Sequence, residues 1–231
     1  LRDIAELCNS NWSGTTLSGV RGISYLDGEG KAIHTATRDY LDVNELPFPA
    51  WKHIDPRWYR DAGKRSPFIT LISGRGCFGR CTFCRDVPLM EGRKLRLRDP
   101  ELVADEIQYD LALFPDLREV MFETNTFTAS STHVSGVCEA IIRRGLKIPW
   151  SCNCRTDVDL KLLPLMKRAG CRMLMVGFEF GTQEALDAVK KGTTLEHSVR
   201  LAQEAKKLGF TVHGCFMFGA PGETRQTALK T

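Results

Sequence analysis

Residues 68–84 read FITLISGRGCFGRCTFC, an apolar run that leads directly into three closely spaced cysteines. Cys77, Cys81 and Cys84 follow a CxxxCxxC spacing. Electron-transfer iron–sulfur clusters normally use four Cys ligands, and structural zinc sites also have four ligands. Three thiolates can each hold one iron of a cubane cluster and leave the fourth iron open. A triplet with no fourth ligand close by in sequence therefore indicates a cluster that takes part in chemistry.

Strands and helices alternate along the chain after this first strand. The apolar stripe Val103, Ile107, Leu111 and Phe114 has helical spacing, and Gly145 suits the end of the next helix. Further strands are expected at about 119–123, 149–154, 171–178 and 211–218, and helices at about 100–114, 133–144, 160–169, 183–191 and 196–208. This alternation predicts an α/β fold with a parallel sheet.

The composition fits an ordinary globular protein. The chain has 231 residues, of which 26% are charged and 42% hydrophobic, and its net charge is +4. The mild positive excess is spread along the chain and gives no argument for nucleic-acid binding. No apolar run approaches the length of a membrane span. Nine cysteines with three of them clustered indicate metal binding rather than disulfides, and we expect a reducing cytoplasm.

The first fifty residues differ from the rest. Residues 22–26 and 31–34 flank the Gly-rich turn Asp27–Gly30, a pattern that predicts a β-hairpin. The stretch 46–51 contains two prolines and is expected to be extended. The chain begins with Leu1 and stops inside an expected helix at Thr231, so we expect a fragment of a longer protein.

The triplet, with the aromatic Phe83 just before its last Cys, resembles the signature of the radical S-adenosylmethionine (radical SAM) enzymes. Other segments are similar to the cobalamin-dependent type of that superfamily. These are GRKLRLRDPELVADEI, IPWSCNCRTD, LMKRAGCRMLMVGFEFGTQE, VKKGTT and VHGCFMFGAPGET. Together the matching segments extend over roughly residues 15–231.

The resemblance implies a fold and a division into domains. We expect a parallel, partial TIM-like barrel of the radical SAM type, truncated to about five of its six β/α units. Residues 1–50 would be the tail of an upstream cobalamin-binding-type domain with its hairpin and linker, 51–65 a connector, and 66–231 the core. The cobalamin motif Asp-x-His-x-x-Gly does not occur in the sequence.

The resemblance also implies cofactors. Cys77, Cys81 and Cys84 would hold a [4Fe-4S] cluster whose open iron binds S-adenosylmethionine. One-electron reduction would then cleave the sulfonium and give a 5′-deoxyadenosyl radical. Cobalamin is a further expected cofactor, bound by a domain outside this chain. The residue that relays or quenches the radical is not identified.

Polar residues at the expected strand ends would hold S-adenosylmethionine, because active sites in such folds lie at the carboxyl ends of the strands. By resemblance, Glu123 and Asn125 lie near its amino group and Arg155 near its carboxylate, with Asn153 on the same strand face as Arg155. Glu179 would accept from the ribose hydroxyls or the amino group. The backbone near Phe83, Gly219 and Pro221 would contact adenine.

Two positions depart from the family pattern. Relatives often have two adjacent acids after the second strand, where this chain has Glu123-Thr124-Asn125 with one. The fourth-strand motif commonly reads Glu-Ser-Gly, where this chain has Glu179-Phe180-Gly181. Both changes lie near the expected cofactor pocket.

We therefore predict a radical SAM enzyme that performs methyl transfer, or a rearrangement or cyclisation, on a small molecule or peptide. A methylthiotransferase-like role fits less well, because no second Cys triplet lies upstream. The alternatives from other classes are an iron–sulfur electron carrier without S-adenosylmethionine chemistry and a zinc-stabilised binding module.

Several features have two interpretations. Lys94, Arg96 and Arg98 alternate with leucines, which indicates a half-buried strand with a solvated basic face, or a dock for an electron donor such as flavodoxin or ferredoxin. His213 is expected to be packed, with a substrate-side acid or base as the other interpretation. The remaining cysteines are expected to be small core residues, namely Cys8, Cys138, Cys152, Cys154, Cys171 and Cys215.

Overall fold

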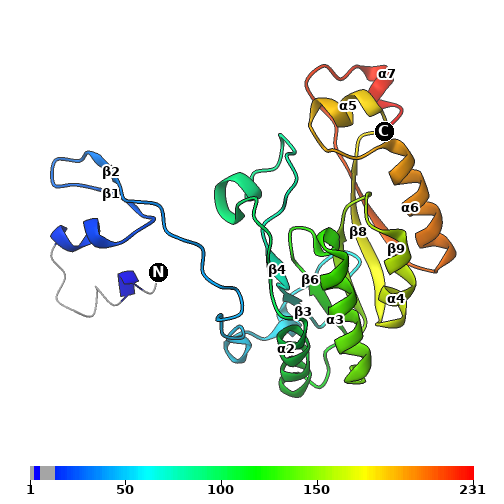
Figure 1. Ribbon diagram of the computed structural model, residues 1–231, viewed down its shortest axis with the longest axis horizontal. Coiled ribbons are helices and arrows are strands. Elements are labelled where there is room, and N and C mark those ends of the chain that lie inside the picture. The colour runs from blue at the N-terminus through cyan, green and yellow to red at the C-terminus, as the bar shows by residue number, and fades with distance from the viewer. Residues whose placement is uncertain (1–2, 6–13) are drawn as a thin grey trace. The chain divides into compact units, whose positions relative to one another are not determined.

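The computed structural model describes residues 3–5 and 14–231 of the chain (Figure 1). The chain folds into two compact units, residues 1–42 and residues 43–231. The boundaries 1–50, 51–65 and 66–231 that the sequence indicates stay a prediction. Cys8 lies outside the described residues.

The smaller unit contains the predicted hairpin. Strands β1 (Ser24–Leu26) and β2 (Ala32–His34) pair antiparallel, with Tyr25 opposite Ile33. The Asp27 carboxylate accepts the backbone N–H groups of Glu29 and Lys31 and closes the turn.

The larger unit is built on a five-stranded parallel sheet with the order β3-β6-β7-β8-β9. Its strands are β3 (Phe68–Leu71), β6 (Glu119–Phe122), β7 (Trp150–Cys154), β8 (Cys171–Glu179) and β9 (Thr211–Phe216). Neighbours in space are also neighbours in sequence, so each crossover adds the next strand on the same side. The sheet is open, with β3 and β9 at its edges, which agrees with the predicted partial barrel.

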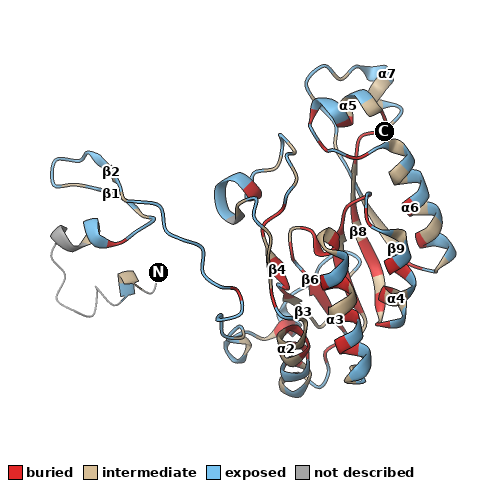
Figure 2. Ribbon diagram, viewed as in Figure 1, coloured by how far each residue is buried: buried red, intermediate tan, exposed pale blue. Residues whose placement is uncertain are grey.

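Helices connect these strands, apart from the last helix, which follows β9, and four of the six build the main core with their hydrophobic faces (Figure 2). The six helices of the larger unit are α2 (Pro100–Leu113), α3 (Ser131–Arg143), α4 (Leu163–Arg168), α5 (Gln183–Ala188), α6 (Leu195–Lys207) and α7 (Arg225–Ala228). The Asp99 carboxylate caps α2 by accepting the backbone N–H of Glu101, the second residue of the helix. Thr194 forms a capping box with His197 at the start of α6.

The two faces of the sheet differ in chemistry because side chains alternate along each strand. On β7, Cys152 and Cys154 point into the core, and both are buried as predicted. Between them, Asn153 lies on the opposite face, where it lines a cavity. This alternation places apolar side chains under the helices and polar side chains on the inner face.

The sequence indicated a strand near residues 94–98 but not the two-stranded sheet to which it belongs. Strands β4 (Gly74–Arg75) and β5 (Arg96–Leu97) pair antiparallel and enclose the Cys loop. The prediction of a solvated basic face on 94–98 was wrong for Arg98, which is 8% exposed. Its guanidinium pairs with the buried Glu106 at 2.5 Å and donates to the Ile72 carbonyl at 3.1 Å.

Other packing predictions have mixed outcomes. Cys138 and Cys171 are buried in the core, as expected. Cys215 is exposed, because it lies near the end of the edge strand β9 with no neighbouring strand beyond it in the described sheet. His213 is half-buried on the same strand. No helix in the described ranges is long and apolar enough to cross a membrane.

Candidate active site

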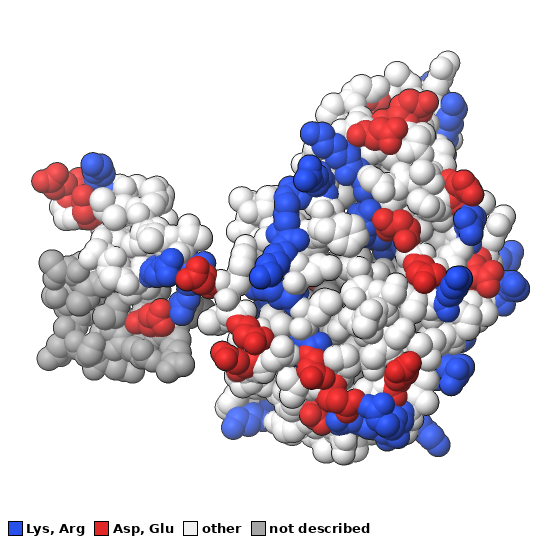
Figure 3. All heavy atoms as spheres, viewed as in Figure 1, with Lys and Arg blue, Asp and Glu red and all other residues white. Residues whose placement is uncertain are grey.

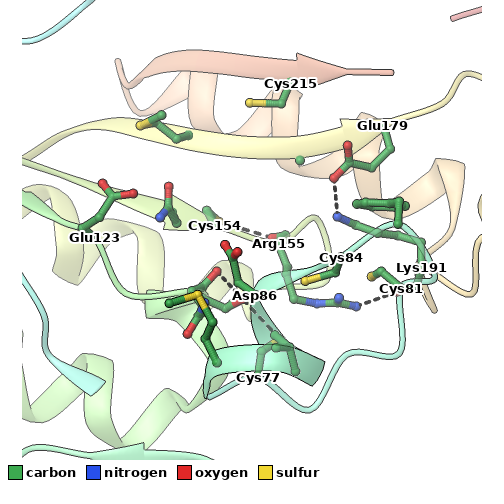
Figure 4. A pocket seen from close by; sticks show the side chains of 18 residues that line it. Cys77, Cys81, Cys84, Asp86, Glu123, Cys154, Arg155, Glu179, Lys191 and Cys215 are labelled. Carbon is green, nitrogen blue, oxygen red and sulfur yellow. Dashed lines mark hydrogen bonds and ion pairs between the residues drawn. The ribbon is translucent and has the colours of Figure 1, made fainter. Parts of the chain in front are cut away.

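One cavity of about 520 Å³ lies at the carboxyl ends of the parallel strands. Its volume is within the usual range for small-molecule sites. The lining joins the three loop cysteines to side chains from β6, β7, β8 and β9 (Figure 4). The predicted site residues that line it are Cys77, Cys81, Phe83, Cys84, Glu123, Asn125, Asn153, Arg155 and Glu179.

Gly79 lets the backbone of the Cys loop approach two of the thiols and Arg155 closely. A methyl group placed on Gly79 would lie 3.3 Å from Cys77 Sγ, 3.8 Å from Cys81 Sγ and 3.3 Å from Arg155 Nη1. All three cysteines are free thiols. The Gly79 N–H points at Cys77 Sγ from 3.4 Å, as amides do around cluster sulfurs.

Within the described residues, no three Cys, His, Asp or Glu side chains are close enough to share one metal ion. A cubane places each thiolate on a different iron and therefore tolerates wider sulfur separations than a single zinc ion does. The triplet, its free thiols and the cavity that all three line fit a [4Fe-4S] cluster with three protein ligands.

Two neighbouring segments hold the Cys loop in place. The Cys77 N–H donates to the Gly92 carbonyl at 3.3 Å, and the Thr82 N–H donates to the Val189 carbonyl at 2.9 Å. Gly76 has φ +86°, and any side chain there would collide with the Lys94 carbonyl. The loop conformation is therefore fixed by backbone contacts rather than by the cysteines alone.

Arg155 lies at the centre of the site with most of its guanidinium engaged. Its Nε and Nη2 donate to the Asp157 carboxylate at 2.9 and 3.0 Å, and Nη2 also donates to the Lys191 carbonyl at 3.0 Å. The remaining Nη1 lies close to Gly79 in the Cys loop. Burial lowers the pKa of Arg155, but the hydrogen bonds and charge of Asp157 outweigh it and raise the pKa above its ordinary value. Arg155 is thus a fixed cation beside the cysteines.

Glu179 carries the one strained backbone conformation among the described residues that line the site. Its φ is +66°, in the left-handed region that non-glycine residues rarely occupy. Its Oε1 accepts from Lys191 Nζ at 2.6 Å, and both side chains are about nine-tenths buried. Lys191 Nζ also lies 5.9 Å from the centre of the Phe83 ring. A side chain on Gly177 would collide with this ion pair, so the glycine makes room for it.

The polar residues after β6 and on β7 form the opposite wall. Glu123 is exposed to the cavity, and Asn125 lies two residues further along the same loop. Asn153 Nδ2 donates to the Thr124 carbonyl at 3.1 Å, which ties the two loops together. The structure therefore gathers six of the eight predicted cofactor-binding residues and the three cysteines at one cavity.

Gly219 and Pro221 do not line this cavity. The Gly219 N–H donates to Glu223 Oε2 at 2.5 Å, and the segment turns toward α7. Sequence reasoning also missed residues that the structure brings to the site, chiefly Lys191, Asp157, Asp86 and Met175. Lys191 lies in the quoted segment VKKGTT and Asp157 two residues after Arg155, but only the fold shows their partners.

A comparison with protein families finds that residues 71–231 match the Radical SAM superfamily. Among curated proteins, the chain is 30% identical over 228 residues to an uncharacterized methyltransferase of Pyrococcus horikoshii, covering 98% of this chain and 49% of that protein. It is also 30% identical to the anaerobic magnesium-protoporphyrin IX monomethyl ester cyclase of Rubrivivax gelatinosus, over 92% of this chain and 38% of that protein. The chain thus spans half or less of these relatives.

Solved structures share the fold. The cobalamin-dependent S-adenosylmethionine radical enzyme OxsB, with aqua-cobalamin and S-adenosylmethionine bound, superposes with a TM-score of 0.81 at 21% identity. That match covers 99% of this chain and 33% of OxsB. The radical S-adenosylmethionine methyltransferase TsrM from Kitasatospora setae, with cobalamin and a [4Fe-4S] cluster bound, gives a TM-score of 0.75 at 20% identity, over 97% of this chain and 45% of TsrM.

Proposed function

The chain belongs to the radical SAM superfamily, and we propose that residues 66–231 form the part of a radical enzyme that binds a [4Fe-4S] cluster and S-adenosylmethionine. Membership implies both cofactors. When bound and reduced, the cluster supplies the electron that cleaves the sulfonium of S-adenosylmethionine to a 5′-deoxyadenosyl radical. The protein binds and orients these groups and excludes water.

One observation carries the proposal, namely that a single cavity joins the CxxxCxxC loop to polar side chains from three neighbouring strand ends, those of β6, β7 and β8. A cluster site that only transferred electrons would need no such cavity and would use a fourth Cys. Cys154 and Cys215 also line the cavity, but Cys154 donates to the Arg155 carbonyl, and Cys215 lies on the far strand β9.

We assign the two ends of the methionyl group to opposite walls. Glu123 and Asn125 offer acceptor oxygens to the amino group. Arg155 offers the charge for the carboxylate, through the Nη1 that Asp157 and Lys191 leave open toward the cysteines. Asn153 would hold the loop after β6 in register by its bond to Thr124.

We assign the ribose hydroxyls to Glu179. Its Oε1 is held by Lys191, and the other oxygen has no protein partner among the described residues. Phe83 lines the same cavity near Lys191, and we assign the adenine contact to its backbone. An adenine contact by Gly219 and Pro221 stays a prediction from sequence.

For the complete protein we propose methyl transfer, or a rearrangement or cyclisation, on a small molecule or peptide. The support is that the similar curated proteins are named methyltransferase and cyclase. Cobalamin is proposed as a further cofactor because OxsB and TsrM bind it. An external one-electron donor is also required.

Electron paramagnetic resonance tests the proposal. The protein is reconstituted anaerobically with iron and sulfide, reduced, and measured with and without S-adenosylmethionine. We expect a reduced [4Fe-4S] signal whose shape changes when S-adenosylmethionine binds. The Cys84→Ala variant, treated identically, serves as the control that lacks a ligand. A cluster signal that S-adenosylmethionine leaves unchanged would refute the proposal in favour of an electron carrier, and zinc in place of a cluster would favour a binding module.

A further inference from the structure

Two chain segments lie against the Cys loop. Residues 92–94 lie against its first half, through the bond from Cys77 to the Gly92 carbonyl and the close approach of Gly76 to Lys94. Residues 189–191 lie against its second half, through the bond from Thr82 to the Val189 carbonyl. The side chains of these segments therefore surround the cluster ligands.

Five of these side chains are exposed and basic, and we call them the basic surface. They are Arg80, Arg85, Arg93, Lys94 and Lys190. Figure 3 shows a band of Lys and Arg on this side of the larger unit, over the loop that connects β4 to β5 in Figure 1. Arg93 donates to the Gly79 carbonyl, and none of the five has an acidic partner among the residues that the structure describes. Their charges are therefore not held in ion pairs within that part of the chain.

The basic surface has an apolar centre. Phe78 is 48% exposed and Leu89 is 73% exposed, and both lie on the Cys loop or directly after it. Two acidic residues, Asp86 and Glu91, lie in the same stretch of sequence, and Asp86 lines the cavity (Figure 4). An exposed apolar centre with an arginine-rich rim is the usual composition of a protein-binding surface.

We propose that the basic surface docks a small acidic protein that delivers the electron to the cluster. This inference rests on the proposed function and deepens it by naming the partner surface. Cys81 and Cys84 are partly exposed beneath it, so a donor group held there would have a short path to the cluster. An acidic protein complements the uncompensated arginines and lysines, and electron-transfer complexes use small, electrostatically steered contacts.

The electron balance is simple. A flavin hydroquinone in the partner gives up one electron and becomes the semiquinone, and the oxidised cluster gains that electron. Nucleic acids are also anionic, but the net charge of +4 is modest and the basic side chains are centred on the cluster loop, where an electron must arrive. The surface therefore favours a redox protein.

The test uses the reconstituted chain and a reduced flavodoxin as the donor. The variant Arg80→Glu/Lys94→Glu reverses two charges of the basic surface. Its matched control, Lys147→Glu/Lys206→Glu, reverses two exposed charges that precede β7 and β9, at the opposite ends of the strands. Stopped-flow bleaching of the cluster gives the bimolecular rate constant, and fluorescence anisotropy of labelled oxidised flavodoxin gives the affinity. Photoreduced 5-deazariboflavin, a neutral small donor, reports whether the cluster itself is intact.

At low salt we expect the first variant to lose about tenfold or more in both rate constant and affinity, and the control to change by less than about twofold. The wild-type rate constant should fall steeply as salt rises, because the Debye length shortens to about 8 Å at 0.15 M. Reduction by deazaflavin should be the same in all three proteins.

Equal flavodoxin rates in both variants and the wild type, with deazaflavin reduction intact, would overturn the docking inference and leave the proposed function standing. Failure of the wild type to assemble a cluster would instead refute the proposed function. If Arg80→Glu/Lys94→Glu does not hold a cluster, Arg85→Glu/Lys190→Glu and the wild-type salt dependence decide the question. A wild-type rate that is independent of salt would overturn the docking inference without any variant.

Discussion

Glu119 and Glu179 lie at opposite ends of the same parallel sheet, and both are buried beside a basic partner. Glu119 begins β6, and both of its oxygens are saturated. Its Oε1 accepts from Ser151 Oγ at 2.6 Å, and its Oε2 accepts from the Arg65 N–H at 3.0 Å and Arg172 Nε at 2.8 Å. Glu179 ends β8 with one oxygen on Lys191 and a left-handed backbone.

The difference separates a structural carboxylate from a functional one. At the amino end, Lys64 closes the space between the strands, with its Nζ 2.9 Å from Met175 Sδ and 3.4 Å from Ser151 Oγ. Burial lowers the pKa of Lys64, as expected for an amine held against thioethers. At the carboxyl end a cavity lies over the strands, and the polar groups that line it retain bonding capacity for a ligand.

The strongest test of this contrast removes a cluster ligand at the carboxyl end. We expect Cys77→Ala to lose the cluster completely, from about four irons per chain to none, because two thiolates cannot replace three. Cys215→Ala is the matched control, since it also removes a thiol from the cavity lining but from the far strand. Iron analysis and the visible absorption band measure both. Full iron content in Cys77→Ala would contradict the assignment.

The next largest effect is expected from substituting Glu119, whose two carboxylate oxygens both accept hydrogen bonds. We expect Glu119→Gln to lower the free energy of unfolding by about 3 kcal/mol, because the guanidinium of Arg172 loses its counter-charge in a buried place. Urea unfolding followed by circular dichroism gives the value. The exposed Glu184→Gln on α5 should change it by less than about 0.5 kcal/mol. Equal changes in the free energy of unfolding for Glu119→Gln and Glu184→Gln would show that the buried ion pair does not stabilise the fold.

Asp110 on α2 extends the comparison to a buried carboxylate that has no hydrogen-bond partner in the described part of the chain. Burial, with the charge of Glu106 in addition, raises its pKa from 3.8 to about 7. The folded protein therefore holds a proton that the unfolded chain releases near pH 4. Stability from this group is present below that pH and is lost as pH rises toward 7.

We expect Asp110→Asn to stabilise the protein at pH 8 by on the order of 2 kcal/mol, less than the roughly 4 kcal/mol of the full shift because ionised groups relax toward water. The gain should disappear near pH 4. His133 has the opposite sign, since burial lowers its pKa to about 4 and costs stability as pH falls below 6.5. Comparing wild type and variant at each pH cancels the His133 contribution, and the exposed Asp116→Asn controls for charge. If the difference in unfolding free energy between Asp110→Asn and wild type did not change with pH, the raised pKa of Asp110 would be contradicted.

The smallest expected effect is that of substituting Glu179, the carboxylate at the cavity. Glu179→Gln should weaken S-adenosylmethionine binding by about tenfold, or about 1.4 kcal/mol, because a neutral amide accepts the ribose hydroxyls less well. Isothermal titration on the reconstituted protein measures it. The amino-end variant Glu119→Gln, studied where it remains folded, should bind normally. Unchanged binding in Glu179→Gln would remove Glu179 from the proposed ligand shell.

Local sequence signals were sufficient for the strands and helices, and together with the family resemblance they named most, but not all, of the polar residues that line the cavity. The hairpin in residues 22–34 and the helices α2, α3 and α6 lie within a few residues of their predicted bounds. The turn residues, helix caps and hydrophobic periodicity that specify these elements lie within the elements themselves. Arg98 was misread because its alternation with leucines predicts a strand face, while its neighbour Glu106 comes from another element.

By itself, the sequence determined that the chain is an α/β protein with a three-cysteine loop after its first core strand, since spacing and periodicity are local properties. Only the tertiary structure decided which polar groups share a cavity, that Lys191 and Asp157 fix Glu179 and Arg155, and that Gly219 and Pro221 lie apart from them. The physical reason is that burial and pairing depend on contacts between residues far apart in sequence. No local sequence pattern shows whether a buried carboxylate will have three hydrogen-bond partners, one or none.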